Sequence, residues 1–171
     1  KCRIGKAFNR PHFDYQLLGW FCGLIYKYIL TTGDSGLLDE TYDGETTVLE
    51  RLEEALEAQL AYRDEETGLY FVEGEVDVQE WTQQLGPVLE GQSRFREGGK
   101  GFYCDCNGAM WGTLVAFADL EDIAGNDDRG RAYREMAEEL RERICKELWN
   151  PEVQFFGDKK VDGSFTGYRG L

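Results

Sequence analysis

The chain has 171 residues, of which 42% are hydrophobic and 13% aromatic, and its formal net charge is −14. The hydrophobic content excludes a disordered chain, and the length allows one domain with a buried core. The negative charge argues against binding to nucleic acid or to an anionic membrane, whereas a neutral ligand such as a sugar, or a cation, stays compatible.

Targeting signals and cysteines give weaker expectations. The sequence has no uninterrupted apolar run of about 18 residues, so it predicts no membrane span. It starts without Met and shows no signal peptide, and we expect a cytoplasmic segment of a longer protein. The five cysteines are an odd number, which disfavours a disulfide scaffold. Cys22 and Cys145 lie within apolar helix patterns and are expected to be small buried residues.

The first half of the chain predicts two helices joined by a glycine turn. Residues 15–31 are dense in large apolar side chains without a wide polar face, which predicts a helix buried nearly all round. The stretch TTGDSG ends it, with Gly33 suited to a helix C-terminus. Residues 45–63 alternate acids with apolar residues at helical spacing, which predicts an amphipathic outer helix. Its apolar positions are Val48, Leu49, Leu52, Leu56 and Leu60.

The second half repeats this scheme. Residues 107–124 predict a second apolar helix, AGNDDRG is the turn, and residues 128–148 predict a second amphipathic helix. Its apolar face comprises Tyr133, Met136, Ala137, Leu140, Ile144 and Leu148. The stretch NPEVQFFGD after it mirrors DEETGLYFVEG after the first pair. The sequence therefore predicts an internal repeat of inner helix, turn, outer helix and extended tail.

The contrast between the helices of each pair predicts two layers, an inner ring covered by an outer ring. A simple four-helix bundle is the alternative, but it predicts similar amphipathicity in all four helices. We expect an all-α fold and one segment over residues 1–171. Its parts are hairpin one at about 15–63, a connecting loop at 64–106, hairpin two at 107–149 and a tail at 150–171. Two hairpins cannot close a ring, so we expect an incomplete one.

These motifs resemble the trehalase-like group of (α/α)6-toroid, or six-hairpin, glycoside hydrolases. Phe13-Asp14 stands where that group often carries Trp-Asp, and Asp105-Cys106-Asn107 stands where it often carries Asp-Leu-Asn. Cellobiose-phosphorylase-like and rhamnosidase-like enzymes share these turns and tails. The connecting loop lacks the group's GWDFSSRW-like signature, which leaves the identity of the catalytic acid open. The resemblance implies an all-α segment built of helical hairpins of an (α/α)6 toroid.

The resemblance also implies that the inner helices begin at a rim facing the substrate. Sugars are bound by carboxylates and amides, which pair with hydroxyl groups, and by aromatic faces, which stack on the ring. A helix N-cap is the alternative role for Asp105 or Asn107. The expected substrate-binding residues are His12, Asp14 and Gln16 before the first inner helix, Trp81 in the connecting loop, and Asp105, Asn107 and Trp111 at the second inner helix.

Glycoside hydrolysis needs two carboxyl groups, one protonated and one ionised. Asp77 and Glu80 in EVDVQEW are the candidates for the catalytic acid, because the apolar ring of Trp81 beside them could raise a carboxyl pKa. In the resembled family the second carboxylate comes from a late hairpin, which we expect beyond Leu171. The isolated segment is therefore expected to be inactive.

The sequence predicts no metal and no cofactor. The motif CDC supplies two thiols where zinc wants four Cys or His ligands, so Cys104 and Cys106 are expected to be packing residues. Residues 39–50 have the acid spacing of a calcium loop, but threonines occupy its third and eighth positions.

The leading hypothesis is a segment of an inverting glycoside hydrolase acting on a neutral α-linked glycoside. A toroid phosphorylase or lyase is the first alternative, with Arg94, Arg96 and Lys100 as the basic cluster that a phosphate pocket would need. A non-catalytic helical-hairpin module that binds a protein is the second. The expected partners are a carbohydrate and either the missing hairpins of the same toroid or a second copy covering the open faces, with no nucleic acid and no membrane.

Overall fold

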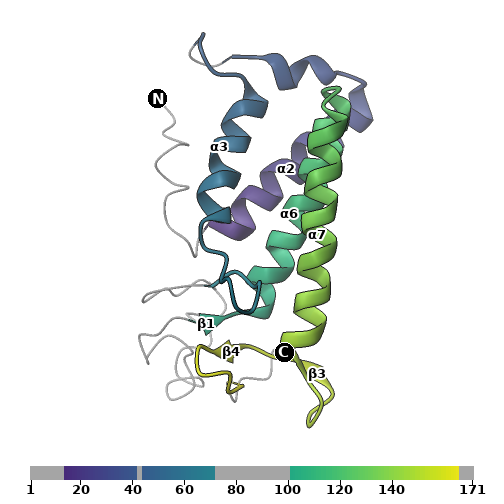
Figure 1. Cartoon of the computed structure of the whole chain (residues 1–171). Coiled ribbons are helices and arrows are strands. Elements are labelled where there is room, and N and C mark those ends of the chain that lie inside the picture. Colours follow the sequence, from purple (N-terminus) through teal and green to yellow (C-terminus); the bar gives the residue numbers. More distant parts are fainter. Residues whose placement is uncertain (1–13, 42–43, 72–100, 166–171) are drawn as a thin grey trace, which may run out of the picture.

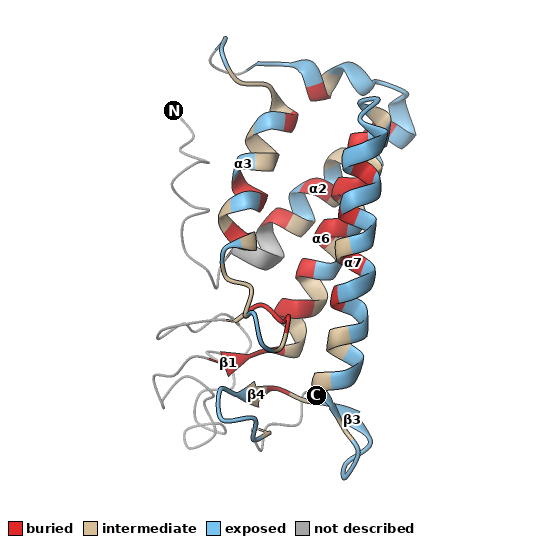
Figure 2. Ribbon diagram, in the orientation of Figure 1, coloured by how far each residue is buried: buried red, intermediate tan, exposed pale blue. Residues whose placement is uncertain are grey.

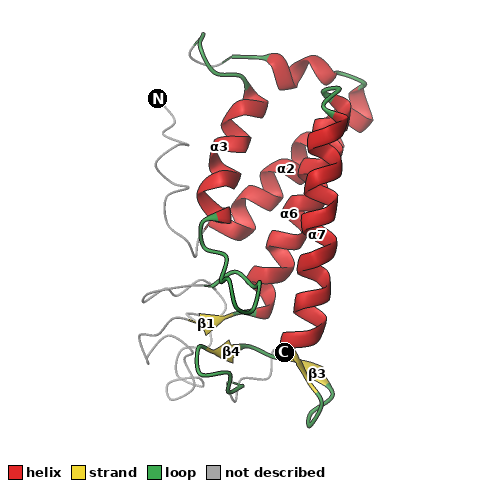
Figure 3. Ribbon diagram, in the orientation of Figure 1, coloured by secondary structure: helices red, strands yellow, loops and turns green. Residues whose placement is uncertain are grey.

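The computed structural model describes residues 14–41, 44–71 and 101–165 and is dominated by helices (Figures 1 and 3). The α-helices of these ranges are α2 (Asp14–Thr32), α3 (Val48–Leu60), α6 (Cys104–Ile123) and α7 (Asp127–Glu147), and a 3-10 helix, η1 (Ser35–Asp39), follows α2. The four predicted helices and the all-α class are thus confirmed. Helix α3 begins three residues later than predicted and α6 three residues earlier.

The start of α3 explains the acidic loop that resembled a calcium site. Thr47 is the N-cap, and its side chain accepts a hydrogen bond from the Glu50 backbone N–H at 3.2 Å. The Glu50 carboxylate in turn accepts one from the Thr47 backbone N–H at 2.8 Å. The hydrogen bond from the Thr47 backbone lowers the pKa of Glu50 most, and the bond with the Thr47 side chain lowers it further. The last acid of the apparent loop therefore serves a capping box.

Short antiparallel strands bring the tail of the second hairpin beside the start of α6. Strand β1 (Gly101–Phe102) pairs with β4 (Lys159–Lys160), and β2 (Trp149–Asn150) pairs with β3 (Phe155–Phe156). Since β1 leads directly into α6, the β1–β4 pair places the segment that follows α7 at the entry of the inner helix.

Helix α6 is the centre of the fold and packs against both α2 and α7. Helices α2 and α6 run in the same direction, and α3 and α7 return (Figure 1). Buried residues follow α6 along most of its length (Figure 2). The fully buried apolar residues where these helices meet include Leu18, Cys22, Met110, Leu114 and Phe117.

The internal repeat is visible in the backbone. Each tail folds back on itself so that residues seven positions apart pair in antiparallel fashion. The pairs are Arg63 with Tyr70 and Trp149 with Phe156. In each tail the backbone has a positive φ at the residue two positions before the second member of the pair. This residue is Gly68 in the first tail, with φ 72°, and Gln154 in the second, with φ 52°. The two tails are therefore equivalent in conformation, as the mirrored sequences predict.

The outer helices present the apolar faces that were predicted. On α7, Tyr133, Ala137 and Leu140 are buried, and Met136 and Ile144 pack against the core. Cys145 was expected to be buried but is exposed, because it lies one position away from this face. Cys22 is buried as predicted, and the cysteines of the described ranges form no disulfide bonds.

The prediction that the first inner helix is buried nearly all round is wrong for the described residues. Only one side of α2 is covered, by α6 and α3. Its exposed large apolar residues are Trp20, Phe21, Leu24, Tyr28 and Leu30, with Trp20 66% exposed. Despite this apolar character, no helix within the described ranges has the length and hydropathy to cross a bilayer.

The contact between α2 and α6 depends on a glycine. A Cβ at Gly19 would lie 2.7 Å from Thr113 Oγ1 and 3.5 Å from the Ala109 carbonyl oxygen. Thr113 is fully buried, and its hydroxyl donates a 2.8 Å hydrogen bond to that carbonyl, so neither group can yield freely.

We expect Gly19→Ala to lower the free energy of unfolding by about 1–2 kcal/mol, because the overpacking cost exceeds the helix-propensity gain. Gly23→Ala is the matched control in the same helix, since a Cβ there meets nothing within 4 Å. It should stabilise by up to about 1 kcal/mol. Urea denaturation of both variants measures the difference, and equal stabilisation by the two changes would contradict the close approach.

Candidate functional site

The two inner helices begin at the same end of the fold (Figure 1). We call this end the rim and define it as the starts of α2 and α6, the turn at 64–71 and the β1–β4 pair. Asp14 opens α2 and Asp105 lies in the first turn of α6, so the two motif positions are at one end, as predicted.

The Asn107 side chain ties the two hairpins together at the rim. Its Oδ1 accepts a hydrogen bond from the Tyr70 backbone N–H at 2.8 Å. Its Nδ2 donates to the carbonyl oxygens of Tyr70 and Tyr103, both at 2.9 Å. Asn107 and Tyr70 are almost completely buried. These contacts account for Asn107 without a ligand, and they pin the first tail to the second inner helix.

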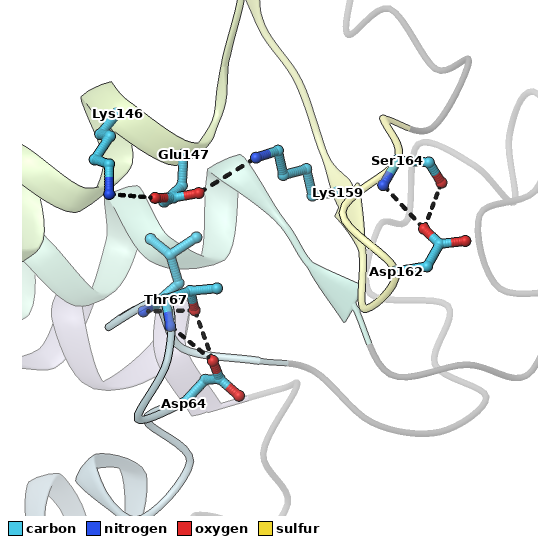
Figure 4. A network of polar contacts seen from close by, with 8 residues as sticks. Asp64, Thr67, Lys146, Glu147, Lys159, Asp162 and Ser164 are labelled. Carbon is cyan, nitrogen blue, oxygen red and sulfur yellow. Dashed lines mark hydrogen bonds and ion pairs between the residues drawn. The ribbon is translucent and has the colours of Figure 1, made fainter.

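The turn that presents Tyr70 is itself held by side chains. Asp64 Oδ2 accepts hydrogen bonds from the Thr67 backbone N–H and hydroxyl, both at 2.9 Å (Figure 4). The Thr67 hydroxyl oxygen then accepts one from the Leu69 N–H at 3.2 Å. Burial raises the pKa of Tyr70 to about 12, so its hydroxyl stays neutral at physiological pH. These hydrogen bonds therefore hold the turn that forms this side of the rim.

A second carboxylate reaches the start of α6 from far along the chain. Asp158, which is 5% exposed, accepts a 2.8 Å hydrogen bond from the Cys104 backbone N–H through Oδ1. The N-cap residue of α6, Tyr103, provides no such bond from its own side chain. Asp158 thus satisfies a free N–H of the helix and places negative charge at its N-terminus. The sequence did not predict this role for Asp158. The only signal for it was the position of Asp158 at the end of FFGD, after the aromatic pair.

The CDC motif is not arranged for thiol chemistry. Burial, followed by the charges of Asp158 and Asp105, raises the pKa of Cys104 to about 11. Cys106 is buried, as predicted for a packing residue. Asp105 Oδ1 accepts a hydrogen bond from the Cys106 N–H at 2.9 Å. Among the residues that the structure describes, no group of three His, Cys, Asp or Glu could hold a metal ion.

The lysines beside the rim are paired with a carboxylate. Glu147 contacts Lys146 Nζ at 3.1 Å and Lys159 Nζ at 3.3 Å (Figure 4). Burial acts to raise the pKa of Glu147, but the bonds to the two lysines outweigh it and hold the pKa below its usual value. The positive charge of β4 is therefore partly neutralised within the chain. In the turn after β4, Asp162 accepts hydrogen bonds from the Ser164 N–H and hydroxyl.

Trp111 is the described aromatic residue that the sequence predicted for sugar stacking. It lies two turns into α6 and is 40% exposed. Its ring is thus accessible, which stacking requires. Contact with a sugar stays a prediction for both Asp105 and Trp111.

The structure does not describe the side chains of the remaining predicted site residues. Those outside the described residues are His12, Asp77, Glu80 and Trp81, together with the alternative phosphate cluster of Arg94, Arg96 and Lys100. Asp14 and Gln16 belong to the first turns of α2, where the backbone alone is described.

The chain is similar to one family of known proteins. A family model described as the mannosylglycerate hydrolase MGH1-like glycoside hydrolase domain matches residues 20–171. The match includes both hairpins and both tails. A comparison with curated proteins found no match.

Proposed function

Because the chain belongs to the mannosylglycerate hydrolase MGH1-like glycoside hydrolase family, we propose that it takes part in the inverting hydrolysis of a neutral α-linked glycoside. Membership confirms the resemblance to the (α/α)6 glycoside hydrolases and makes the substrate a carbohydrate. The stereochemistry, the linkage and the neutrality of the substrate are the proposed part. The observation that carries the proposal is this family match over residues 20–171.

Charge supports a neutral substrate. The name of the family points to mannosylglycerate, which carries a carboxylate. An anion would be bound by a cation at the rim, and two of the lysines there, Lys146 and Lys159, already contact Glu147. Asp158 adds a buried carboxylate, and the whole chain has a net charge of −14. The described rim therefore suits an uncharged sugar better than an acid.

The proposed chemistry divides the roles among four residues. Asp77 or Glu80 is the general acid that protonates the leaving oxygen, with Trp81 beside it keeping the carboxyl protonated. Asp105 pairs with sugar hydroxyls. The base that activates water on the opposite face comes from another hairpin of the toroid.

Further side chains complete the proposed binding site. Trp111 stacks on the sugar ring, and His12, Asp14 and Gln16 supply further polar contacts to the sugar. Asn107 acts by fixing the rim, since both of its amide hydrogens are already used.

The second tail supports a structural partner for the chain. In the first tail Leu69 and Tyr70 are buried, and Tyr70 is bonded to Asn107 of α6. At the equivalent positions of the second tail, Phe155 is 53% and Phe156 36% exposed. By the repeat, a further hairpin of the same toroid covers them. Sedimentation of the 171-residue chain should give a monomer, and a tight dimer would instead assign this surface to a second copy.

The full-length protein can be tested on a panel of neutral α-linked disaccharides, aryl α-glycosides and mannosylglycerate, with and without phosphate. We expect hydrolysis of a neutral α-glycoside at a rate independent of phosphate. Phosphate-dependent turnover that yields a sugar phosphate would replace the hydrolase by a phosphorylase, and an unsaturated product would replace it by a lyase. Turnover of mannosylglycerate alone would contradict the neutral substrate. Absence of turnover and of sugar binding would favour the helical-hairpin module.

A further inference from the structure

A partly buried charge cluster joins three helices at the end of the fold opposite the rim. Its two carboxyl groups are the buried members, whereas the Arg129 side chain is 50% exposed. Glu53 comes from α3, Glu121 from α6 and Arg129 from the first turn of α7. The Glu121 side chain is completely buried, and that of Glu53 is 13% exposed. Arg129 forms an ion pair with Glu53 Oε1, and its Nε lies 3.5 Å from Glu121 Oε1.

The cluster holds two carboxyl groups for one cation. Glu121 Oε2 accepts a 2.8 Å hydrogen bond from Asn126 Nδ2. The Oε1 atoms of Glu53 and Glu121 are both buried and, despite their nearness to Arg129, have no well-formed hydrogen bond within the described residues. The two Oε1 atoms approach the same guanidinium group of Arg129, so the two carboxyl groups are neighbours around one cation. A bond between two carboxyl groups requires a proton on one of them.

We propose that Glu53 and Glu121 share one proton, which makes the attachment of α3 to α6 and α7 a pH-sensitive clamp. With the proton bound, one carboxyl donates to the other and Arg129 balances the remaining charge. Without it, two carboxylates face each other in a buried place, and their repulsion loosens α3. The clamp stands apart from the rim and does not depend on which sugar the protein acts on.

Burial and the neighbouring Glu121 favour the protonated form of Glu53, whereas Arg129 opposes it. Burial comes first among the causes that raise the pKa of Glu53, to about 7, followed by the bond to Glu121 and the charge of Glu121. Arg129 opposes this rise but does not cancel it. Tyr133 on α7 faces the same cluster beside Arg129. From the other elements packed on α3, Lys27 of α2 and Asp39 of η1 are exposed to solvent.

The direction of the pH dependence follows from linkage. The pKa of Glu53 is higher in the folded chain than its ordinary value of 4.5, so the folded state binds the proton more tightly than the unfolded state. The stabilisation is therefore fully present below about pH 4.5 and is lost as the pH rises to about 7. Above that range the clamp is open.

The test compares Glu53→Gln with the wild-type chain, because the amide has the shape and the neutral charge of the protonated acid. We expect the two folding equilibrium constants to agree within a few-fold at pH 5, where most of the stabilisation is still present. At pH 8 the variant should be favoured by at least about tenfold, since it cannot develop the second charge. Glu57→Gln is the control, because it makes the same change at an exposed position of the same helix. Its effect should not change with pH.

Two results would overturn the clamp. One is an equal loss of stability in Glu53→Gln at pH 5 and pH 8, which would mean that Glu53 is ionised throughout and simply pairs with Arg129. The other is a carbon NMR titration of the wild-type Glu53 carboxyl with a midpoint below 5. The NMR titration needs no variant, so it decides the question even where Glu53→Gln does not fold.

Discussion

Asn107→Ala is expected to lower the free energy of unfolding by about 3–4 kcal/mol, because it removes three hydrogen bonds and leaves buried backbone groups without partners. The groups that lose a bond would be the N–H and carbonyl of Tyr70 and the carbonyl of Tyr103, of which the last keeps the backbone N–H of residue 107 as a donor. Since these bonds join the first tail to α6, the loss should also separate the two hairpins at the rim. Urea denaturation measures the stability, and amide hydrogen exchange at Tyr70 reports the local opening.

Asn150→Ala is the matched control for this change. Asn150 accepts a single hydrogen bond from the Glu152 N–H, at 3.0 Å, in an exposed turn. Its loss should cost less than about 1 kcal/mol. A similar small effect at position 107 would show that the hairpins are not held together by the Asn107 amide.

Asp77→Asn or Glu80→Gln in the full-length protein is expected to abolish turnover while leaving the fold intact. Each amide is isosteric with its acid, so packing survives but proton donation does not. The loss of a general acid typically costs about 100-fold to 10,000-fold in kcat. We expect the larger effect at Asp77, because its position before QEW is nearest to where the resembled family places its acid. Steady-state kinetics on the preferred glycoside, with circular dichroism as the fold check, measures both.

Glu66→Gln serves as the control for those two variants, since Glu66 is an exposed carboxylate in the connecting region. It should keep full activity. A loss of only a fewfold in both Asp77→Asn and Glu80→Gln would remove this loop from the mechanism and leave the acid to be found elsewhere in the protein.

Much of the fold could be predicted because it depends on local periodicity. The apolar face of α7, from Tyr133 to Leu148, follows from residue spacing alone and is the face that packs on the core. The glycine turns and the mirrored tails likewise predicted the repeat. Gly33 and Gly125 both take a positive φ, 73° and 82°, after an inner helix.

Burial could not be predicted in the same way, because it depends on which neighbours are present. Helix α2 is apolar all round, yet Trp20 and Leu24 are exposed, since the described residues supply partners for one side of the helix only. Cys145 was predicted to lie on the buried face of α7. That face is narrow, and Cys145 lies one position away from it and is exposed.

The site depended on contacts between distant parts of the chain, which spacing does not reveal. Asp158 bonds the start of α6 across 54 positions, and Asn107 bonds Tyr70 across 37. Asn107 could be recognised as important from its motif, but the sequence offered a sugar ligand or an N-cap as its role. The structure shows instead a tie between two hairpins. Asp77 and Glu80 lie outside the described residues, so their assignment still rests on sequence.

The most direct test of inverting hydrolysis is the anomer that the full-length protein releases first. Proton NMR of the anomeric signals in the first minutes of the reaction, before mutarotation, resolves the two products. For a neutral α-linked glycoside we expect the β-anomer first, with the α-anomer growing in later at the spontaneous rate, because water attacks from the face opposite the leaving group. Initial release of the α-anomer would contradict the account, since it would require a covalent intermediate and a nucleophile in place of the proposed base.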